Sequence, residues 1–306
     1  MPQRGSGGLW RGPGSEGGGV PLGRLTPPRN TLRGPPPESP PLPGDAGWPH
    51  RRIALGPLPL DAVCRAEAVR TIQGLVESGR GGAVLLSTAD GLSLARRSAA
   101  FREALERAEL SLADGQRLCW AAQLLRRPLP GDVPAADLLP PLLEVASKNR
   151  WRVFLVGEAP AQLEAWAAEL ERRHAVRMVG TFAPSLWKDG TVSGALVEDT
   201  ARAVLRANPQ LVLVALPSPA QEVLIDGLKS RLRPGVAVGL GPGLGLAVTA
   251  RGTAPEAVRR LRLGWAWRLF GGPRRLGRRG LFGDLRFLWA FARVLLSEFQ
   301  RSSPLP

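Results

Sequence analysis

Leu211-Val-Leu-Val-Ala-Leu-Pro-Ser-Pro-Ala-Gln-Glu222 is the stretch of this sequence that decides its fold class. Its apolar, β-branched beginning predicts a strand, the Pro-Ser-Pro triplet predicts a turn, and the residues that follow predict the start of an amphipathic helix. In an open α/β sheet the ligand crevice lies at the carboxyl ends of the strands. This turn would therefore offer Ser218, Gln221 and Glu222, beside a helix N-terminus, to an anionic ligand. A purely structural alternative is that Ser218 caps the helix while Gln221 and Glu222 form a capping box in its first turn.

The same alternation of strands and helices extends along the chain on both sides of this stretch. Short apolar runs predict strands, and segments of about ten to sixteen residues with helical periodicity separate them. This pattern is typical of right-handed βαβ units, so we predict a doubly wound, mostly parallel, Rossmann-like α/β sheet. The predicted strands are Gly82–Ser87, a short strand within 108–115, Trp151–Gly157, Arg177–Phe182, Leu211–Leu216 and Gly235–Leu240.

The first ordered elements are expected near Arg52. The run 52–60 predicts one short strand, and Asp61 is expected to cap the helix that follows it. After the strand Gly82–Ser87, the pattern predicts a single helix from about Leu92 to Glu106.

Polar side chains directly follow two of the predicted strands. Thr88 and Asp90 come after the strand that ends at Ser87, and the pair Asp114-Gly115 ends the next strand along the chain. An Asp-Gly pair is usually turn chemistry, because Gly takes a positive φ at no steric cost. The functional alternative is that Asp114, at the carboxyl edge of the sheet, acts as a general base.

The composition indicates a folded and strongly basic protein. The 306 residues are 44% hydrophobic, which is enough for a sizeable core, and the net charge of +15 predicts an anionic partner. Cys64 and Cys119 have no metal-ligand spacing and are expected to be core thiols. His50 is expected at the edge of the disordered tail and His174 at the end of a surface helix, so neither can serve a catalytic triad or a metal cluster. We find no signal-peptide pattern and no uninterrupted apolar run of about 18 residues, so we predict no membrane span.

Changes in composition divide the chain into three predicted parts. Residues 1–50 are rich in Pro and Gly and are expected to be disordered, and residues 51–255 form the α/β domain. Residues 256–306, the C-terminal appendage, interleave arginines with Trp and Phe and are expected to be helical. A run of charges is more often a solvated face. Here the aromatic residues at helical spacing favour an amphipathic segment on an anionic membrane surface.

Common phosphate-binding motifs are missing. The chain has no Walker motif, and the glycines of 239–245 have the wrong spacing for a dinucleotide fingerprint. It also has no Asp-x-Asp pair that could hold a divalent ion on a nucleotide diphosphate. We therefore predict no cofactor and no metal, and expect backbone N–H groups and arginines to neutralise any phosphates.

The order of the motifs resembles that of the WecG/TagA/CpsF family of bacterial glycosyltransferases, over about residues 52–295. The resemblance implies transfer of N-acetylmannosamine, or a related sugar, from a UDP donor to a polyprenyl-diphosphate-linked sugar. The reaction would invert the anomeric configuration without a metal, in cell-surface polysaccharide synthesis on the inner face of the cell membrane. The motifs that carry the resemblance are Thr88-Ala-Asp90, Ala113-Asp-Gly115, Asp137-Leu138, Pro217-Ser-Pro-Ala-Gln-Glu222, Trp265-Ala-Trp-Arg-Leu269 and Pro273-Arg-Arg275.

The resemblance also implies roles for individual residues. Asp114 matches the proposed catalytic base, which would take the proton from the acceptor hydroxyl. Substrate-binding positions are implied at two groups of residues. The first group lies at the strand ends and helix starts of the α/β domain and consists of Thr88, Asp90, Gly115, Asp137, Gln221 and Glu222. The second group lies in the C-terminal appendage, where it would meet the diphosphate and the membrane, and consists of Arg268, Arg274 and Arg275.

Three departures from the family pattern leave an alternative open. Asp132 stands where the family has a loop arginine, 241–245 lacks the family's carboxylate, and Gly264 replaces a glutamate. The alternative is a degenerate, non-catalytic member that binds a lipid-linked glycan or a partner at the membrane. Nucleic-acid binding by the appendage ranks below both, so no nucleic-acid partner is predicted. The sequence allows a monomer or a homo-oligomer.

Overall fold

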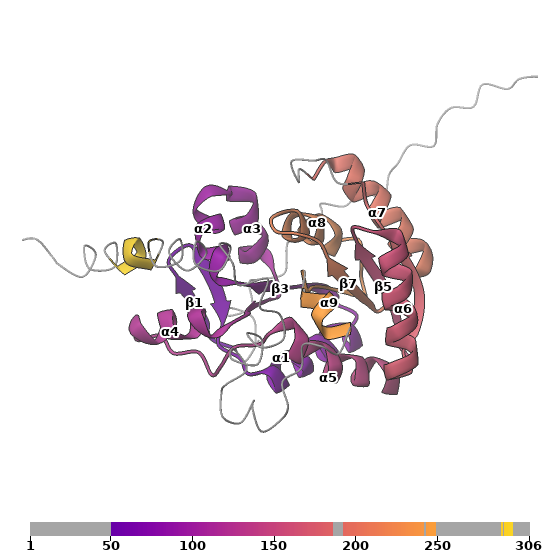
Figure 1. Ribbon diagram of the computed structural model, residues 1–306, viewed down its shortest axis with the longest axis horizontal. Coiled ribbons are helices and arrows are strands. Elements are labelled where there is room, and N and C mark those ends of the chain that lie inside the picture. Colours follow the sequence, from indigo (N-terminus) through magenta and orange to yellow (C-terminus); the bar gives the residue numbers. More distant parts are fainter. Residues whose placement is uncertain (1–49, 186–191, 242, 249–288, 290, 296–306) are drawn as a thin grey trace, which may run out of the picture. The chain divides into compact units, whose positions relative to one another are not determined.

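The computed structural model describes residues 50–185, 192–241, 243–248, 289 and 291–295 (Figure 1). Residues 1–49 of the predicted tail and most of the C-terminal appendage lie outside the described residues, so the predicted domain boundaries stay predictions.

A six-stranded sheet forms the centre of the domain, and each pair of neighbouring strands in it is parallel. The sheet confirms the predicted doubly wound α/β class. Its strands, in spatial order, are β4 (Leu110–Ala113), β3 (Gly82–Ser87), β8 (Val236–Gly239), β7 (Leu211–Ala215), β5 (Arg152–Gly157) and β6 (Arg177–Phe182).

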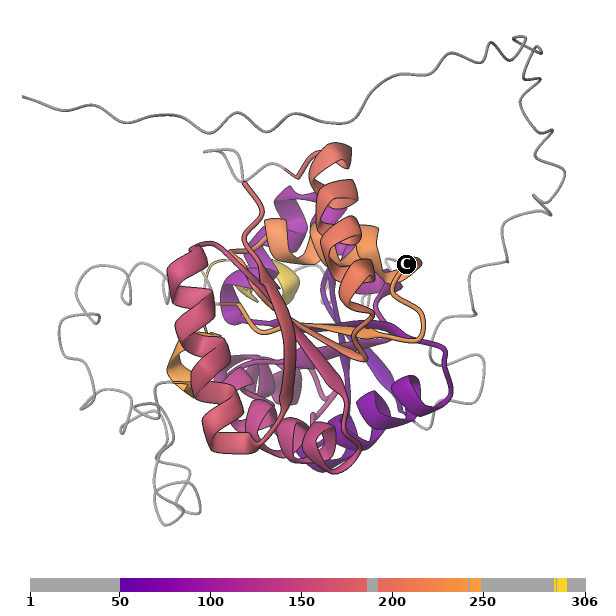
Figure 2. The ribbon, with the colours of Figure 1, turned by 90° about the vertical axis from the view of Figure 1, so that its right-hand side faces the viewer.

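Helices cover both faces of this sheet (Figure 2). One face carries α2 (Ala89–Arg97), α3 (Ala99–Arg107), α4 (Gln116–Leu124), α7 (Gly194–Ala207) and α8 (Ala220–Lys229). The opposite face carries α1 (Arg65–Glu77), α5 (Ala135–Lys148), α6 (Pro160–His174) and α9 (Gly243–Val248).

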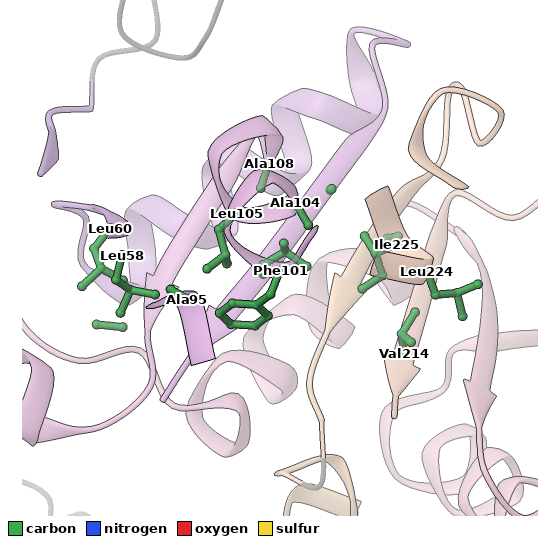
Figure 3. Packing of buried hydrophobic residues seen from close by; sticks show 14 of the residues in the cluster. Leu58, Leu60, Ala95, Phe101, Ala104, Leu105, Ala108, Val214, Leu224 and Ile225 are labelled. Carbon is green, nitrogen blue, oxygen red and sulfur yellow. The ribbon is translucent and has the colours of Figure 1, made fainter. Parts of the chain in front are cut away.

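The alternation of side chains along each strand divides the core into two layers. In β7, Val212 and Val214 belong to the first layer, whereas Leu211 and Leu213 belong to the second. The apolar run of this strand is continuous because a parallel strand is buried on both faces. In the first layer, Phe101 of α3 and Ile225 of α8 belong to one buried cluster with Val214 (Figure 3).

After the two neighbouring central strands β3 and β8, the chain continues into helices on opposite faces of the sheet. From β3 the chain runs to α2, whose Leu92 lies in the first layer, and from β8 it runs to α9, whose Leu244 lies in the second. In open α/β sheets, such a switch point between adjacent strands opens the ligand crevice at their carboxyl ends. The topology therefore places the crevice beside β3 and β8.

The expectation for residues 52–61 is wrong in two respects. Instead of one strand, the run forms an antiparallel hairpin of β1 (Arg52–Leu55) and β2 (Leu58–Asp61), because Gly56 at φ 60° turns the chain. Asp61 does not cap a helix. Its carboxylate is buried, binds the Arg52 guanidinium at 2.8 Å and accepts a hydrogen bond from the Ser111 N–H of β4 at 2.7 Å. The hairpin is thus attached to the edge strand of the sheet, and α1 begins only after Cys64.

The single helix expected over 92–106 is two helices. It breaks at Ser98, which has an extended conformation between α2 and α3. Its hydroxyl oxygen accepts a hydrogen bond from the Phe101 N–H and so caps the second helix.

The described part of the C-terminal appendage packs against the domain. Residues 291–295 are helical, and the side chains of Phe291 and Val294 are buried in the first core layer with the hairpin. A Cβ atom on Gly56 would lie 2.7 Å from Val294 Cγ2, so the hairpin turn and this helix are in close contact.

Candidate functional site

Asp114 and Thr88 leave the sheet side by side. In the pairing of β3 with β4, Ser87 lies opposite Ala113, and the Asp114 N–H donates to the Ser87 carbonyl at 2.8 Å. Thr88 follows at the N-terminus of α2 and is exposed. The structure therefore brings these two predicted site residues together at the carboxyl edge.

Gly115 fixes the direction in which the chain leaves β4. Its φ of 118° lies in the left-handed half of the map, where a side chain would be strained, and it directly precedes α4. The turn reading of the Asp-Gly pair is therefore confirmed. The turn holds Asp114 half-buried at the end of the strand, a position that a general base can use.

Asp90 and Asp137 lie in the first turns of two different helices. Asp90 is exposed in the first turn of α2, two residues after Thr88. Asp137 is half-buried in α5, which packs on the opposite face of the sheet. The loop before α5 is tied to the site strand, because the Val133 N–H donates to the Ala113 carbonyl at 2.8 Å. Both carboxylates are thus near strand ends, but the helices that carry them pack on opposite faces of the sheet.

Gln221 joins two turns at the carboxyl edge. Its side-chain oxygen accepts hydrogen bonds from the Gly241 N–H at 2.7 Å and from the Leu216 N–H at 3.4 Å. Gly239 allows this close approach, because a Cβ there would lie 2.8 Å from the amide nitrogen of Gln221. The buried amide of Gln221 therefore fixes the turn after β8 relative to the turn after β7, on the crevice side of the sheet.

The predicted capping box at α8 is wrong. The helix begins after Pro219, and no side chain caps it. The Ser218 hydroxyl instead donates to Glu222 Oε1 at 2.7 Å. Burial raises the pKa of the Glu222 carboxyl, and the hydrogen bond from Ser218 only partly opposes this rise. Glu222 is 1% exposed and Gln221 2%, so the first turn of α8 holds two buried polar side chains, and the exposed Ser218 of the triplet bonds to one of them.

Two buried polar atoms at this edge have no hydrogen-bond partner among the described residues. They are the Ser87 hydroxyl oxygen, at the end of β3, and Glu222 Oε2, in α8. Ser87 follows Leu85 in the alternation of β3 and so faces the same layer as α8. Ser87 was not among the predicted binding residues, although its place at the end of an apolar strand is a signal that the sequence carries.

A cavity of about 310 Å³ lies near the turn that carries Asp114. The first residue of its wall along the chain, Gln116, is two residues after Asp114. The walls of the cavity are Gln116, Cys119, Trp120 and Gln123 of α4 and the loop 128–132. Asp132, the position at which the resemblance leads us to expect an arginine, lies in this wall and accepts a hydrogen bond from the Gln116 amide at 2.6 Å. Sequence reasoning missed the cavity, because Trp120 lies off the apolar stripe of α4 and looks like an ordinary surface residue.

Cys119 is only half-buried, so the expectation of a core thiol is wrong for it. Burial, together with the charge of Asp132, raises the pKa of the Cys119 thiol to about 12. At neutral pH the sulfur is therefore protonated and is a poor nucleophile. Cys64 is likewise half-buried, at the N-terminus of α1, so the same expectation is wrong for it.

The remaining predicted groups are not placed by the structure. Arg268, Arg274, Arg275 and Gly264 lie outside the described residues. Within the described part of the chain, no three His, Cys, Asp or Glu side chains meet in an arrangement that could hold a metal ion. No helix in that same part is long and apolar enough to cross a membrane.

Comparisons with known proteins give one family and a set of relatives. The model of the glycosyl transferase WecG/TagA/CpsF family matches residues 53–301. A protein of Bacillus subtilis (strain 168), named N-acetylglucosaminyldiphosphoundecaprenol N-acetyl-beta-D-mannosaminyltransferase, is 26% identical over 171 residues. That match covers 56% of this chain and 64% of the relative, which is less than two thirds of its length. A Staphylococcus aureus (strain MW2) protein of the same name is 26% identical over 180 residues, with 58% and 68% covered.

Proposed function

Because this chain belongs to the WecG/TagA/CpsF family of glycosyl transferases, we propose that it transfers N-acetylmannosamine, or a closely related sugar, to a lipid-linked acceptor. The acceptor is a polyprenyl-diphosphate-linked N-acetylglucosamine, by analogy with the names of the relatives. The donor is the UDP-activated sugar.

The observation that carries this proposal is the pairing of β3 with β4. It places Asp114 and Thr88 side by side at the carboxyl edge, beside the switch point where α/β folds bind ligands. A carboxylate at this point can take the proton from an acceptor hydroxyl as that oxygen attacks the anomeric carbon. One base suffices for a single displacement, which inverts the configuration and breaks the bond between the sugar and UDP.

The other predicted residues have roles around this step. Thr88, Asp90 and Gln221 border the donor, and Gly115 shapes the turn that presents Asp114. Glu222 and Asp137 lie behind these donor-binding residues, in the first turns of α8 and α5. Three arginines of the appendage (Arg268, Arg274 and Arg275) meet the diphosphate. We propose that the phosphates are neutralised in this way without a metal.

We place the protein on the cytoplasmic face of the cell membrane, bound peripherally through the appendage. Arginine and tryptophan together suit an anionic interface, where Trp sits at the level of the headgroups. The described end of the appendage supports this placement. Trp289 is 58% exposed, and the Arg293 guanidinium lies 3.7 Å from the centroid of its ring.

Release of UDP tests the proposal. The purified chain is mixed with UDP-N-acetylmannosamine and a short-chain acceptor, with and without chelator, and UDP is measured over time. We expect turnover that chelator does not affect, and Asp114→Asn should lower kcat by about 10²- to 10⁴-fold, the usual contribution of a general base. UDP affinity should be unchanged in this variant. Asp199→Asn, an exposed carboxylate on α7, is the matched control and should retain full activity.

Asp132 favours one specific alternative, the non-catalytic family member. A carboxylate in place of a loop arginine removes a phosphate partner from the edge of the site. If neither UDP release nor UDP binding is measurable, the enzymatic proposal fails and this alternative takes its place.

A further inference from the structure

The cavity between α4 and the loop 128–132 lies directly beside the proposed base. Gln116, in its wall, is two residues from Asp114, and the loop on its other side is tied back to Ala113 through Val133. Its volume of about 310 Å³ is at the lower end of the range of about 300–1,000 Å³ for small-molecule sites. A ligand in this cavity would therefore lie beside the turn that carries Asp114, on the β4 side.

The side chains of the wall suit an uncharged, hydroxyl-rich ligand. Trp120 is 60% exposed and supplies a flat apolar face. Gln116 and Gln123 supply amide groups, and Asp132 supplies a carboxylate that Gln116 holds at 2.6 Å. Amides and carboxylates bind sugar hydroxyls, and the C–H face of a pyranose ring stacks on an aromatic ring.

The same wall disfavours a phosphate. None of the residues that line the cavity, in the part of the chain that the structure describes, is lysine or arginine, whereas Asp132 is acidic. A diphosphate in this cavity would meet the carboxylate of Asp132, which repels it. The departure at Asp132 therefore has a chemical meaning, since it suits this wall to a neutral ring.

We propose that this cavity is the subsite for the acceptor sugar, in which a neutral N-acetylhexosamine ring stacks on Trp120 and donates hydroxyl hydrogen bonds to Asp132. This inference rests on the proposed function. The acceptor fits better than the donor sugar, because a general base must touch the attacking hydroxyl. The turns that suit the donor, around Gly241 and Gln221, lie on the opposite side of Asp114, toward the centre of the sheet.

The experiment uses a water-soluble, short-chain acceptor, so that no membrane is present. UDP release is measured against acceptor concentration at saturating donor. We expect Trp120→Ala to raise the acceptor KM by roughly tenfold to a hundredfold, the range that removal of a stacking ring produces. The kcat, the donor KM and the UDP affinity should stay within about threefold, and Trp120→Phe should restore most of the acceptor affinity.

Leu124→Ala is the matched control, because Leu124 lies one turn further along α4 and is 68% exposed but does not line the cavity. It should leave the acceptor KM unchanged. The inference is overturned if both variants weaken binding to anionic vesicles while neither changes the KM of the soluble acceptor, because α4 would then be a lipid contact. It is also overturned if Trp120→Ala has no effect in an enzyme that Asp114→Asn inactivates; in that case the proposed function stands.

A second measurement does not depend on turnover. Saturation-transfer NMR with the methyl glycoside of N-acetylglucosamine reports weak binding directly. Transfer to the sugar in the parent chain and its loss in Trp120→Ala would support the subsite even if no UDP were released. An absence of transfer in the parent chain, at millimolar sugar, would overturn it.

Discussion

Glu222 shows how burial changes the behaviour of a single carboxyl group. Its carboxyl is almost fully buried in α8, one oxygen accepts from Ser218, and burial raises its pKa above the ordinary value of 4.5. The folded state therefore favours the neutral acid. Its contribution to stability is fully present below the carboxyl's ordinary pKa and is lost as pH rises through the raised, folded-state pKa.

We predict that Glu222→Gln, which cannot ionise, becomes progressively more stable than the parent as pH rises from 5 to 8. The difference in the free energy of unfolding between the two chains, measured by urea denaturation at each pH, isolates the effect because other titrating groups cancel. Glu106→Gln, at an exposed position on α3, serves as the control and should give a small, constant difference. A difference that is flat for Glu222→Gln as well would contradict the prediction.

At the scale of elements, one side chain holds two turns of the site together. The amide oxygen of Gln221 accepts the buried Gly241 N–H, so the turn after β8 depends on the first turn of α8. Removal of the amide leaves a buried donor without this acceptor.

We predict that Gln221→Ala lowers the free energy of unfolding by about 1–3 kcal/mol and weakens donor binding through the loosened turn. Chemical denaturation and calorimetric titration of UDP measure the two effects. Gln73→Ala, which removes a surface amide bound to Glu77 on α1, should change stability by less than about 0.5 kcal/mol. Equal stability losses in the two variants would argue against the bracing role.

The elements that the sequence predicts well are those whose pattern depends on burial alone. The strand at 211–216 and the strands β3, β4, β5 and β8 follow from apolar runs, because parallel strands inside a sheet are buried on both faces, whereas the edge strand β6 is only partly buried. The hairpin at 52–61 was missed because the turn at Gly56 and Pro57 is hidden in a run that alternates like one strand. The capping box failed for a different reason. The Ser218 hydroxyl can either accept from a backbone N–H as a cap or donate to a carboxylate, and only the packing of α8 decides that it donates to Glu222.

The candidate site was likewise predictable in its local parts and not in those that depend on packing. Asp114, Thr88 and Gln221 were identified because they stand next to strands or to a motif. Their mutual positions required the strand order, which local patterns do not contain. The contact of Asp132 with Gln116 also required the fold, because Gln116 and Trp120 belong to α4 whereas Asp132 lies in the loop 128–132.

For the molecule as a whole, the net charge of +15 governs its encounters with surfaces. A charge of this size attracts anionic lipid over about a Debye length, roughly 10 Å at 0.1 M salt. Each basic residue near such a surface contributes about 1 kcal/mol.

We predict that the chain binds vesicles of anionic phospholipid at 50 mM salt and is largely released at 500 mM, whereas neutral vesicles bind little at either salt. Sedimentation with the vesicles measures the bound fraction. Duplex DNA at equal phosphate concentration is the competing anion, and it should bind more weakly than the anionic vesicles because it offers no interface for Trp. Preferential binding to DNA would favour a nucleic-acid partner instead.

The close contact of Gly56 with Val294 has a consequence for the way this protein is made. The hairpin that carries Gly56 leaves the ribosome before the strands and helices of the described domain that follow it, yet Val294, which contacts its turn, is translated more than 230 residues later. At about 5–20 residues per second, roughly 10–50 s of synthesis separates the two. During that interval the nascent chain shows an uncovered apolar surface at the hairpin, so a chaperone that binds it there would shield it until residues 291–295 emerge.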